Sequence, residues 1–530
     1  MTDVRTAFLD VCRGAGLTTW FGNPGSTELR MLRDWPADLT YVLALQESSA
    51  VGMAAGHAIA TGGAALVSLH SAGGVGHALG AVFNAFRDRV PLVLVAGQQT
   101  RAMLPTQPFL SADEPAAFPR PYVKWSRQPD TAAAVPAALA EAHLIATTPP
   151  RGPVFLSVPE DDWDEPAEPV RTRAVRAGFA PEPAALQELA AALTDASSPA
   201  IVTGPGVDAE NAWPLAVDLA TALRAAVWSA PMSARAGFPE DHSLFRGHLP
   251  PVRGEVARLL RGHDVILVLG APVFTYHVHT EGPFLPEGAQ LFHLDCDPAA
   301  AARAAVGTSI LGTVHAGLEG LLALLDRPAP PHNDADHPAP PAVRLFAPVL
   351  DDPLEGDAVL AALCRALPGD AVLVEEAPSH KDAFHEQLPI TRPGGYVTTG
   401  SGALGWGLPV AVGRALAGER VVAVLGDGSS LYNIQALWTA ARHGARLTVI
   451  VLDNRRYEAV SALGRRVGVA TVPGTDLPGL DFVALAQGFG CAAARVEKAA
   501  DLQAALETAL AHEGPYVLDI AVAPGGGHLY

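Results

Sequence analysis

Two side chains that could bind a metal ion follow two apolar runs in the C-terminal third of the chain. The first run leads into Gly426-Asp427-Gly428, and the second ends at Asp453-Asn454. In an open parallel sheet, Asp427 and Asn454 would both lie at the carboxyl ends of strands, where such sheets bind ligands. A carboxylate and an amide oxygen suit a hard cation such as Mg²⁺, and glycines let backbone N–H groups approach a phosphate. This spacing therefore predicts a metal–diphosphate site.

The segment between these two residues supports that interpretation. It reads as an amphipathic helix, so the stretch Val421–Asn454 has the order strand, glycine-rich turn, helix, strand. A simpler interpretation is that Asp427 forms a common Asp-Gly turn and that Asn454 caps the next element. The strand–turn–helix–strand context, together with a second group of polar residues far upstream, favours the metal site.

The second group consists of Ser26, Glu47 and His70, which follow three predicted strands. These strands are Thr18–Phe21, Tyr41–Ala44 and Leu66–Leu69. The helix after Glu47 is rich in small residues and would pack closely, so this carboxylate could share a proton with a ring nitrogen. Each residue also has an ordinary interpretation: Ser26 as a helix N-cap, Glu47 as a helix-dipole carboxylate and His70 as a core histidine. Their convergence on one edge of one sheet favours a catalytic site.

Composition limits the class of protein. The chain has 530 residues, of which 49% are apolar and 17% charged, as in a well-packed globular protein of several domains. A formal net charge of −19 argues against broad binding to nucleic acid or acidic membranes, which requires a basic face. The four cysteines lack metal-ligand spacing, and no apolar run reaches membrane-spanning length, so we expect a cytoplasmic protein with reduced thiols.

Two stretches of unusual composition divide the chain. Pro159–Ala185 is acidic, proline-rich and too poor in apolar periodicity for a core element, and Asp326–Pro348 has the composition of an extended linker. Three blocks remain, covering residues 1–180, 181–335 and 345–530, and each alternates short β-rich runs with longer helical patterns. We therefore expect an α/β fold of three doubly wound parallel-sheet domains.

Short motifs along nearly the whole chain resemble those of thiamin diphosphate-dependent 2-oxo acid decarboxylases, and among these the benzoylformate decarboxylases. The motifs lie in the order expected for that family: FGNPGSTEL (21–29), LALQES (43–48), SLHSAGGVG (68–76), AGQQTRAM (96–103), LSVPEDDWD (156–164), GAPVFTYH (270–277), LGDGS (425–429), ALWTAA (436–441) and VPGTDLPGLDF (472–482). The resemblance implies an N-terminal pyrimidine-binding domain, a central α/β domain and a C-terminal diphosphate-binding domain. It also implies a homotetramer whose active sites lie between two subunits.

The resemblance assigns cofactor-binding roles to residues in the first and last blocks. Glu47 matches the glutamate that hydrogen-bonds the pyrimidine N1′ of thiamin diphosphate. Leu404 matches the apolar residue that bends the cofactor, and the Gly402 carbonyl would meet the exocyclic amine. Metal ligands for Mg²⁺ or Ca²⁺ are matched by Asp427, Asn454 and the main-chain oxygen of Arg456. The other expected cofactor contacts are Asn23, Pro24, Gly25, Pro378, Ser379, Gly426, Gly428, Ser429, Tyr432 and Tyr457.

Three polar residues match the catalytic groups of the family. Ser26 would orient the substrate carboxylate, and His70 and His277 would transfer protons near neutral pH. By itself, His277 in TYHVHTEG would be interpreted as a solvated loop histidine. The substrate pocket implied by the resemblance comprises Ser26, His70, Thr398, Val460 and Leu463.

Several positions depart from the family pattern. Thr398 and Leu463 stand where benzoylformate decarboxylases have phenylalanines beside the substrate ring, which implies a wider, less aromatic pocket. Pro378 replaces a threonine near the diphosphate, Glu458 replaces a glycine, and His77 replaces an asparagine.

Together these features predict a carboxy-lyase that converts an aryl or branched 2-oxo acid, of the benzoylformate type, to an aldehyde and CO₂. An alternative on the same cofactor is a carboligase or synthase that forms 2-hydroxy ketones or acetohydroxy acids. A nucleotide-binding module, suggested by turns such as Thr203-Gly204-Pro205-Gly206, lacks a full dinucleotide fingerprint. An inactive paralogue is disfavoured because Glu47, His70 and His277 are all present.

Overall fold

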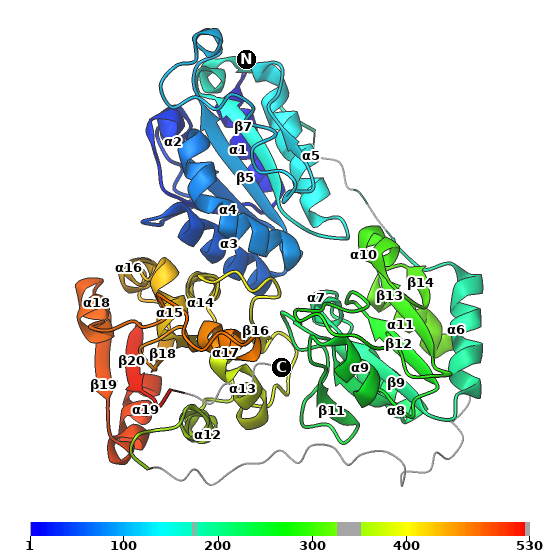
Figure 1. The fold of residues 1–530 in the computed structure, drawn as a ribbon. Helices are drawn as coiled ribbons and strands as arrows, with labels where there is room; N and C mark the ends of the chain where they lie inside the picture. The colour runs from blue at the N-terminus through cyan, green and yellow to red at the C-terminus, as the bar shows by residue number, and fades with distance from the viewer. Residues whose placement is uncertain (1, 172–174, 176–177, 326–350, 525–530) are drawn as a thin grey trace.

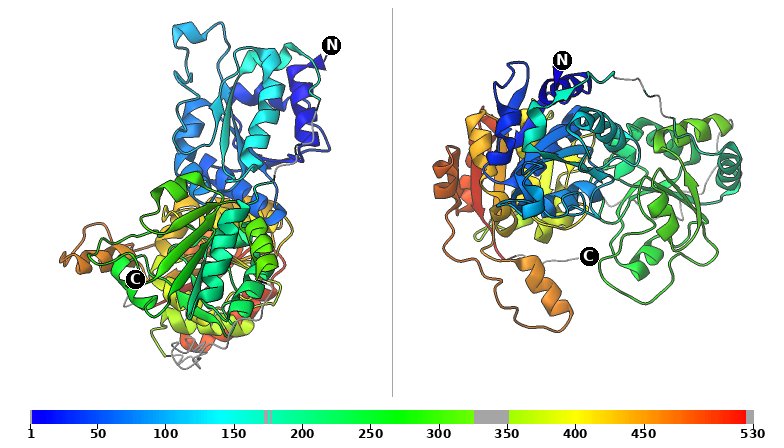
Figure 2. Two further views of the ribbon diagram at one scale, coloured as in Figure 1. Left: turned by 90° about the vertical axis from the view of Figure 1, so that its right-hand side faces the viewer. Right: turned by 90° about the horizontal axis from the view of Figure 1, so that it is seen from above.

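Three six-stranded parallel sheets form the protein (Figure 1). The computed structural model describes residues 2–171, 175, 178–325 and 351–524, so the predicted linker Asp326–Pro348 lies outside the described residues. The N-terminal domain lies over the C-terminal domain, and the middle domain lies beside it (Figures 1 and 2). The predicted α/β fold of three parallel-sheet domains is confirmed.

The N-terminal sheet has the strand order β3-β2-β4-β5-β7-β6. Helices α1 and α5 pack on one face, and α3 and α4 pack on the other. Because β3, β2 and β4 are neighbours, the segments that follow them reach the same edge of the sheet, as the sequence predicts. The elements are β2 (Thr19–Gly22), β3 (Thr40–Leu43), β4 (Ala65–Leu69), β5 (Leu92–Gln98), β6 (Ser126–Arg127), β7 (Val154–Pro159), α1 (Val4–Gly14), α3 (Glu47–Thr61), α4 (Ser71–Arg87) and α5 (Val135–Thr147).

The C-terminal sheet has the order β16-β15-β17-β18-β20-β19, with the glycine-rich turn after its central strand β17. Strands β17 and β18 are parallel neighbours, and Gly426 lies opposite Leu452. The elements are β15 (Val372–Glu376), β16 (Tyr396–Val397), β17 (Val421–Gly426), β18 (Leu447–Asp453), β19 (Ala492–Val496), β20 (Tyr516–Ala521), α12 (Gly356–Ala366), α13 (Lys381–Gln387), α14 (Gly407–Leu416), α15 (Asp427–Ser430), α16 (Ala436–Arg442), α17 (Glu458–Arg466), α18 (Phe482–Gly488) and α19 (Leu502–Ala511).

The middle sheet has the order β11-β10-β9-β12-β13-β14. Its last strand, β14, and its first, β11, were not predicted from the sequence, and neither was β6 of the N-terminal sheet. All three are edge strands, so each is paired on one side only and carries little of the apolar sequence that marks a buried strand. The elements are β9 (Pro199–Thr203), β10 (Ala226–Ser229), β11 (Phe245–His248), β12 (Val265–Leu269), β13 (Gln290–Asp295), β14 (Thr308–Leu311), α6 (Pro183–Asp195), α7 (Pro205–Ala209), α8 (Trp213–Leu223), α9 (Arg253–Leu259), α10 (Pro298–Arg303) and α11 (Val314–Leu324).

The prediction that Pro159–Ala185 contributes no core element is wrong for its first part. Trp163 is only 2% exposed, and its ring centroid lies 5.0 Å from that of Phe8 in α1, with the two rings nearly perpendicular. Strand β8 (Pro166–Ala167) pairs antiparallel with β1 (Thr2–Asp3), and Arg101 binds the buried Asp162 at 2.7 Å. One tryptophan and one paired carboxylate therefore anchor a segment whose composition predicted no core element.

Helix α3 of the N-terminal domain and helix α14 of the C-terminal domain pack backbone against backbone. A Cβ atom added at Gly56 would lie 2.1 Å from the Val410 carbonyl oxygen, and one added at Gly413 would lie 1.9 Å from the Met53 carbonyl oxygen. Glycine is therefore required at both positions, because any side chain would push the helices apart. This contact sets the distance between the two domains that carry the predicted site.

We expect Gly413→Ala to lower the free energy of unfolding by about 2 kcal/mol or more, because its methyl group overlaps backbone that cannot move alone. The thermal midpoint and urea unfolding of the purified protein measure this loss. Gly80→Ala in α4 is the matched control, since a Cβ there meets nothing within 4 Å, and it should leave the midpoint unchanged or raise it. Equal midpoints for Gly413→Ala and the unchanged protein would contradict the required close approach.

Candidate active site at the carboxyl ends of two sheets

Asp427 and Asn454 meet at the carboxyl ends of β17 and β18. Both accept from the same backbone donor, because the Arg456 N–H lies 3.0 Å from Asp427 Oδ2 and 3.1 Å from Asn454 Oδ1. The Gly428 N–H also donates to Asp427 at 2.7 Å. The two side chains that the sequence paired across 27 positions (427 to 454) are thus neighbours in space.

The Asp427 carboxylate has the environment of a cation ligand. It is 3% exposed, and burial raises its pKa to about 6 despite the backbone hydrogen bonds that it accepts. Among the described residues it forms no ion pair with a Lys or Arg side chain. A buried carboxylate with an amide oxygen beside it and no charge partner fits Mg²⁺ or Ca²⁺.

The side chain of Arg456 turns away from this pair of oxygens. Its guanidinium lies 3.2 Å from Glu458, and Arg465 binds the same carboxylate at 2.6 Å. Glu458, which replaces a glycine of the family pattern, is 3% exposed, so two arginines balance a charge that would otherwise be buried alone. The main-chain oxygen of Arg456 remains chemically suited to a third ligand.

The glycine-rich turn leaves room for backbone alone. A Cβ on Gly428 would lie 2.3 Å from the Tyr457 ring, so a side chain there would displace the tyrosine. The Ser429 hydroxyl is already engaged, since it donates to the Glu376 carbonyl at 2.6 Å and to the Gly426 carbonyl at 3.1 Å. Pro378 and Ser379 lie half-buried in the turn after β15, and Tyr432 is 55% exposed.

Segment 402–405, which precedes α14, is fixed by groups that sequence reasoning did not find. Glu376 accepts from the backbone N–H groups of Trp406 at 3.0 Å and Gly407 at 3.2 Å, and burial raises its pKa to about 8.

Two asparagines also hold this segment. Asn433 donates to the Gly405 carbonyl at 2.6 Å. Asn84 of α4 donates to the Ala403 carbonyl at 3.0 Å, so both domains hold the segment that carries Gly402 and Leu404. In the sequence, Glu376 could have been found as the second residue of an acidic pair that ends an apolar strand.

His70 is held by Glu28, a residue to which sequence reasoning gave no catalytic part. Its Nδ1 lies 3.1 Å from Glu28 Oε2 and 3.0 Å from the Thr27 hydroxyl. Glu28 also accepts from the Gly25 N–H at 2.8 Å, and burial raises its pKa against these hydrogen bonds. Because Nδ1 is engaged by Glu28 and Thr27, Nε2 is the atom suited to exchange a proton with a substrate. The spacing of Gly25 and Glu28, a capping-box pattern, was the available signal.

The segment that follows β2 lies against the His70 ring. A Cβ on Gly25 would lie 2.2 Å from His70 Nδ1, so this glycine contacts the imidazole directly. Asn23 is half-buried, whereas Pro24 and Ser26 are exposed at the same edge.

Glu47 begins α3 and is 8% exposed. Its Oε2 lies 3.2 Å from Nδ1 of His77, the residue that replaces an asparagine in the family pattern. The next two residues join the C-terminal domain, because the Ser48 and Ser49 hydroxyls donate to Asn433 at 2.8 and 2.9 Å. Through Asn433, the start of the Glu47 helix is linked to the segment 402–405.

The remaining predicted residues lie in three separate places. Thr398 is buried, and its hydroxyl donates to Glu375 at 2.8 Å, so it is oriented toward an acid and not toward open space. Val460 is exposed and Leu463 half-buried, one turn apart on α17. His277 is exposed on the loop after β12 in the middle domain, where its backbone N–H donates to Pro251 at 2.9 Å.

Comparison with known proteins matches this arrangement to one family. The N-terminal TPP binding domain of thiamine pyrophosphate enzymes matches residues 2–116, the central domain matches residues 186–321, and the C-terminal TPP binding domain matches residues 377–520. The chain belongs to the thiamine pyrophosphate enzymes. The resemblance inferred from the motifs is thereby confirmed.

Relatives cover the chain from end to end. Benzoylformate decarboxylase of Pseudomonas aeruginosa is 42% identical and covers 98% of this chain and 99% of its own length. The large subunit of Escherichia coli acetolactate synthase isozyme 2 is 26% identical over 96% of this chain and 94% of its own length. The chain is therefore a homologue of a thiamine pyrophosphate-dependent carboxy-lyase.

Solved structures that resemble this chain belong to similar decarboxylases. Benzoylformate decarboxylase from Polynucleobacter necessarius superposes with a TM-score of 0.96 at 36% identity over 99% of both chains. The 4-hydroxybenzoylformate decarboxylase of Rhodococcus jostii RHA1 gives 0.91 at 38% identity over 98% of this chain and 99% of its own. Within the described part of the chain, no helix has the length and apolar character that crossing a membrane requires.

We expect Asp427→Asn to abolish the rise in thermal midpoint that Mg²⁺ and thiamin diphosphate give the unchanged protein. Only the ionised carboxylate binds a cation, so the Mg²⁺ affinity should fall roughly tenfold per pH unit below pH 6. Burial raises the pKa of Asp427, so its ionisation destabilises the cation-free fold as pH rises through about 6. Cation-free Asp427→Asn should therefore match or exceed the stability of the unchanged protein at pH 8.

The control for this substitution is Asp370→Asn, whose side chain is 66% exposed. It should keep the full response to Mg²⁺. A response in Asp427→Asn equal to that of the control would remove Asp427 from the metal site.

Proposed function

We propose that the protein decarboxylates a 2-oxo acid, of the benzoylformate type, with thiamin diphosphate held through Mg²⁺ or Ca²⁺. The observation that carries this proposal is the buried Asp427 carboxylate, which shares a backbone donor with Asn454 and pairs with no Lys or Arg side chain in the described part of the chain. Asp427, Asn454 and the Arg456 carbonyl would hold the cation. Gly428, Ser429, Pro378, Ser379, Tyr432 and Tyr457 surround the diphosphate in this proposal.

Bound thiamin diphosphate would supply an electrophilic carbon and accept the electron pair that decarboxylation releases. Glu47 would hold a proton at the pyrimidine N1′, and its low exposure keeps water from competing for that hydrogen bond. Leu404 and the Gly402 carbonyl would set the cofactor's shape, on a segment fixed by Glu376 and Asn433. The rigidity of that segment is the chain's main contribution to orientation.

The substrate would be oriented and protonated by groups of the N-terminal and middle domains. Ser26 would bind the substrate carboxylate, and His70 Nε2 would move the proton, with Glu28 keeping the ring in one orientation. His277 would provide a second imidazole from the loop after β12.

The substrate class follows from relatives and from the pocket residues together. Similar proteins are described as benzoylformate and 4-hydroxybenzoylformate decarboxylases. Thr398, Val460 and Leu463 supply no aromatic ring, so we propose an aryl or branched 2-oxo acid bound by aliphatic contact in a wider pocket.

We also propose a cytoplasmic homotetramer whose active sites lie between two subunits. Apolar side chains exposed in the single chain support an additional partner surface. Leu29 beside Ser26 is 63% exposed, Phe109 is 84% exposed and Val467 at the end of α17 is 75% exposed. A second copy of the chain would cover side chains that are costly to leave in water.

The purified protein with Mg²⁺ and thiamin diphosphate should release CO₂ and aldehyde from members of a panel of aryl and branched 2-oxo acids. Cofactor binding is verified on the same sample by its effect on the thermal midpoint. A cofactor-loaded sample that turns over no member of the panel would overturn the decarboxylase proposal.

The same panel tests the carboligase alternative, which the acetolactate synthase relatives favour. Each reaction is analysed for aldehyde and for 2-hydroxy ketone or acetohydroxy acid. Predominantly coupled products would make the protein a synthase.

Glu47→Gln should slow hydrogen–deuterium exchange at the thiazolium C2 by on the order of 100-fold or more, because an amide cannot hold the proton at N1′. The fold should survive, since the amide preserves the shape of the side chain. Exchange is followed by NMR after acid quench, and the thermal midpoint is measured in parallel. Glu141→Gln, at an exposed position on α5, is the control. Unchanged exchange in Glu47→Gln would refute the assignment.

A further inference from the structure

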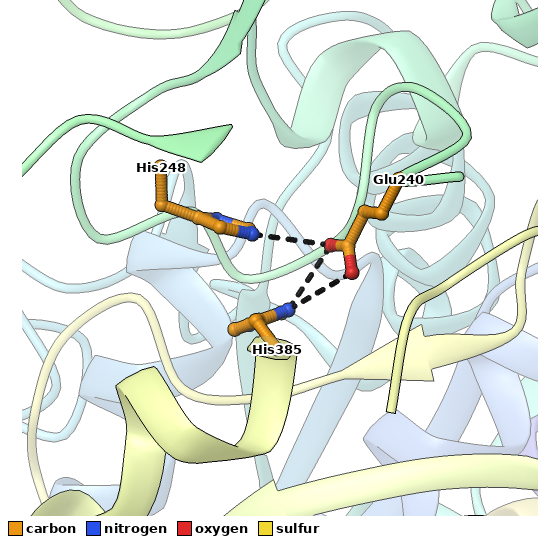
Figure 3. A group of neighbouring side chains, drawn as sticks. All are labelled: Glu240, His248 and His385. Carbon is orange, nitrogen blue, oxygen red and sulfur yellow. Dashed lines mark hydrogen bonds and ion pairs between the residues drawn. The ribbon is translucent and has the colours of Figure 1, made fainter. Parts of the chain in front are cut away.

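Three metal-binding side chains meet at the contact between the middle and C-terminal domains, outside the proposed active site (Figure 3). Glu240 lies between β10 and β11, His248 ends β11, and His385 lies on α13 of the C-terminal domain. One ligand atom from each residue lies within 4.8 Å of the other two. Sequence analysis did not single out any of them, because they are far apart along the chain.

The Glu240 carboxylate is the centre of this group, which we call the Glu240 cluster. Its side chain is 3% exposed, and its Oε1 lies 3.0 Å from His385 Nδ1 and 3.3 Å from His248 Nε2. Figure 3 shows both ring nitrogens directed at the carboxylate. Oε1 and His248 Nε2 are nevertheless both buried without a hydrogen bond. Two ring nitrogens and an unsatisfied carboxylate oxygen thus converge on one small volume.

Two of these separations lie close to the edge of a metal coordination polyhedron, and the third, between the two ring nitrogens, is within 4.8 Å. Zinc binds His nitrogen at about 2.0–2.1 Å and carboxylate oxygen at about 2.0–2.2 Å, so neighbouring ligands in a tetrahedron lie roughly 3.4 Å apart. The contacts at 3.0 and 3.3 Å need only small side-chain shifts to reach that value. Two imidazoles and one carboxylate are also a donor set that first-row transition metals prefer to Mg²⁺.

The backbone around Glu240 is already fixed. Its N–H donates to the Ile390 carbonyl, and the Ile390 N–H donates to Glu240 Oε2, each at 2.9 Å. Oε2 is therefore engaged by the backbone and also lies 3.3 Å from His385 Nδ1, while Oε1 faces both rings. In metal sites, a hydrogen bond to the carboxylate oxygen that does not bind the metal fixes the orientation of the carboxylate. The Ile390 N–H makes such a bond to Glu240 Oε2.

The Glu240 cluster also opens on a cavity of about 470 Å³, whose wall includes all three residues together with Lys381 and Tyr396. A water molecule or a small anionic ligand could enter from this cavity and complete the coordination. We propose that Glu240, His248 and His385 bind a divalent first-row transition metal such as Zn²⁺, with the cavity supplying the fourth ligand.

A metal there would join two domains. Glu240 and His248 belong to the middle domain, whereas α13 directly follows the turn that carries Pro378 and Ser379. Binding would therefore fix the middle domain against the segment that leads to the proposed diphosphate site, and it would raise the stability of the folded protein.

The full-length protein, stripped with a chelator and reloaded with thiamin diphosphate and excess Mg²⁺, is titrated with Zn²⁺. We expect one tight equivalent per chain by metal analysis after gel filtration, and a thermal midpoint that rises by several degrees. Glu240→Gln and His385→Gln should each weaken this equivalent by on the order of 100-fold or more, because each removes a direct ligand. Co²⁺ in place of Zn²⁺ should give visible absorption in the unchanged protein, and both variants should lose it.

His315→Gln is the matched control, because His315 and Glu319 form a pair on the surface of α11 at 3.5 Å without a third ligand. It should bind Zn²⁺ as the unchanged protein does. The proposal is overturned if the unchanged protein binds no tight equivalent and gives no Co²⁺ absorption, or if the two ligand variants match the control. The first result would identify the Glu240 cluster as an ordinary histidine–glutamate ion pair.

Discussion

The contact of α3 with α14 is the constraint on which the arrangement of the N-terminal and C-terminal domains within one chain depends. Main chain meets main chain at Gly56 and Gly413, so the spacing of the N-terminal and C-terminal domains is fixed by backbone atoms and not by adjustable side chains. The first residue of α3 is Glu47, and α14 begins directly after segment 402–405. Both helices thus carry their functional groups at the end that faces the other domain.

The hydrogen bonds around Asn433 extend the same constraint. This one amide accepts from Ser48 and Ser49 of the N-terminal domain and donates to the Gly405 carbonyl of the C-terminal domain. Buried polar groups that are fully paired allow only one geometry. Within one chain, the places of the Glu47 carboxylate and of the Gly402 carbonyl are therefore set by packing and by hydrogen bonds that do not themselves touch a substrate.

The sequence predicted the parts of the fold whose signals are local. The strands before Ser26, Glu47 and His70 were predicted to within one residue of β2, β3 and β4, and their adjacency is confirmed, because apolar runs mark buried parallel strands. Edge strands such as β11 lacked this signal. The prediction that Pro159–Ala185 contains no core element failed because Trp163 is buried although no apolar periodicity around it marks a helix or strand. The fold class and the family were correct; the site roles of individual residues stay predictions.

The residues that orient the site were harder to find than those that would do chemistry. Glu28, Glu376 and Asn433 act through partners that lie tens to hundreds of positions away. The local signals of Glu28 and Glu376, a capping-box spacing and an acidic pair, do not reveal those partners. Glu458 shows the opposite case. In the sequence, Glu458 replaces a glycine of the family pattern and would place a charge near the site. In the fold, Arg456 and Arg465 balance the charge of its carboxylate.

The hydroxyl of Thr398 has a consequence for how substrate preference can change in this lineage. Glu375 is 2% exposed and accepts from Thr398, Tyr396 and its own turn. A phenylalanine at position 398 alone would take one donor from a buried acid, and an apolar residue at 375 alone would leave the threonine hydroxyl without its acceptor. The two positions are thus epistatic, and a path between aliphatic and aromatic pockets passes through a weakened intermediate unless both residues change together.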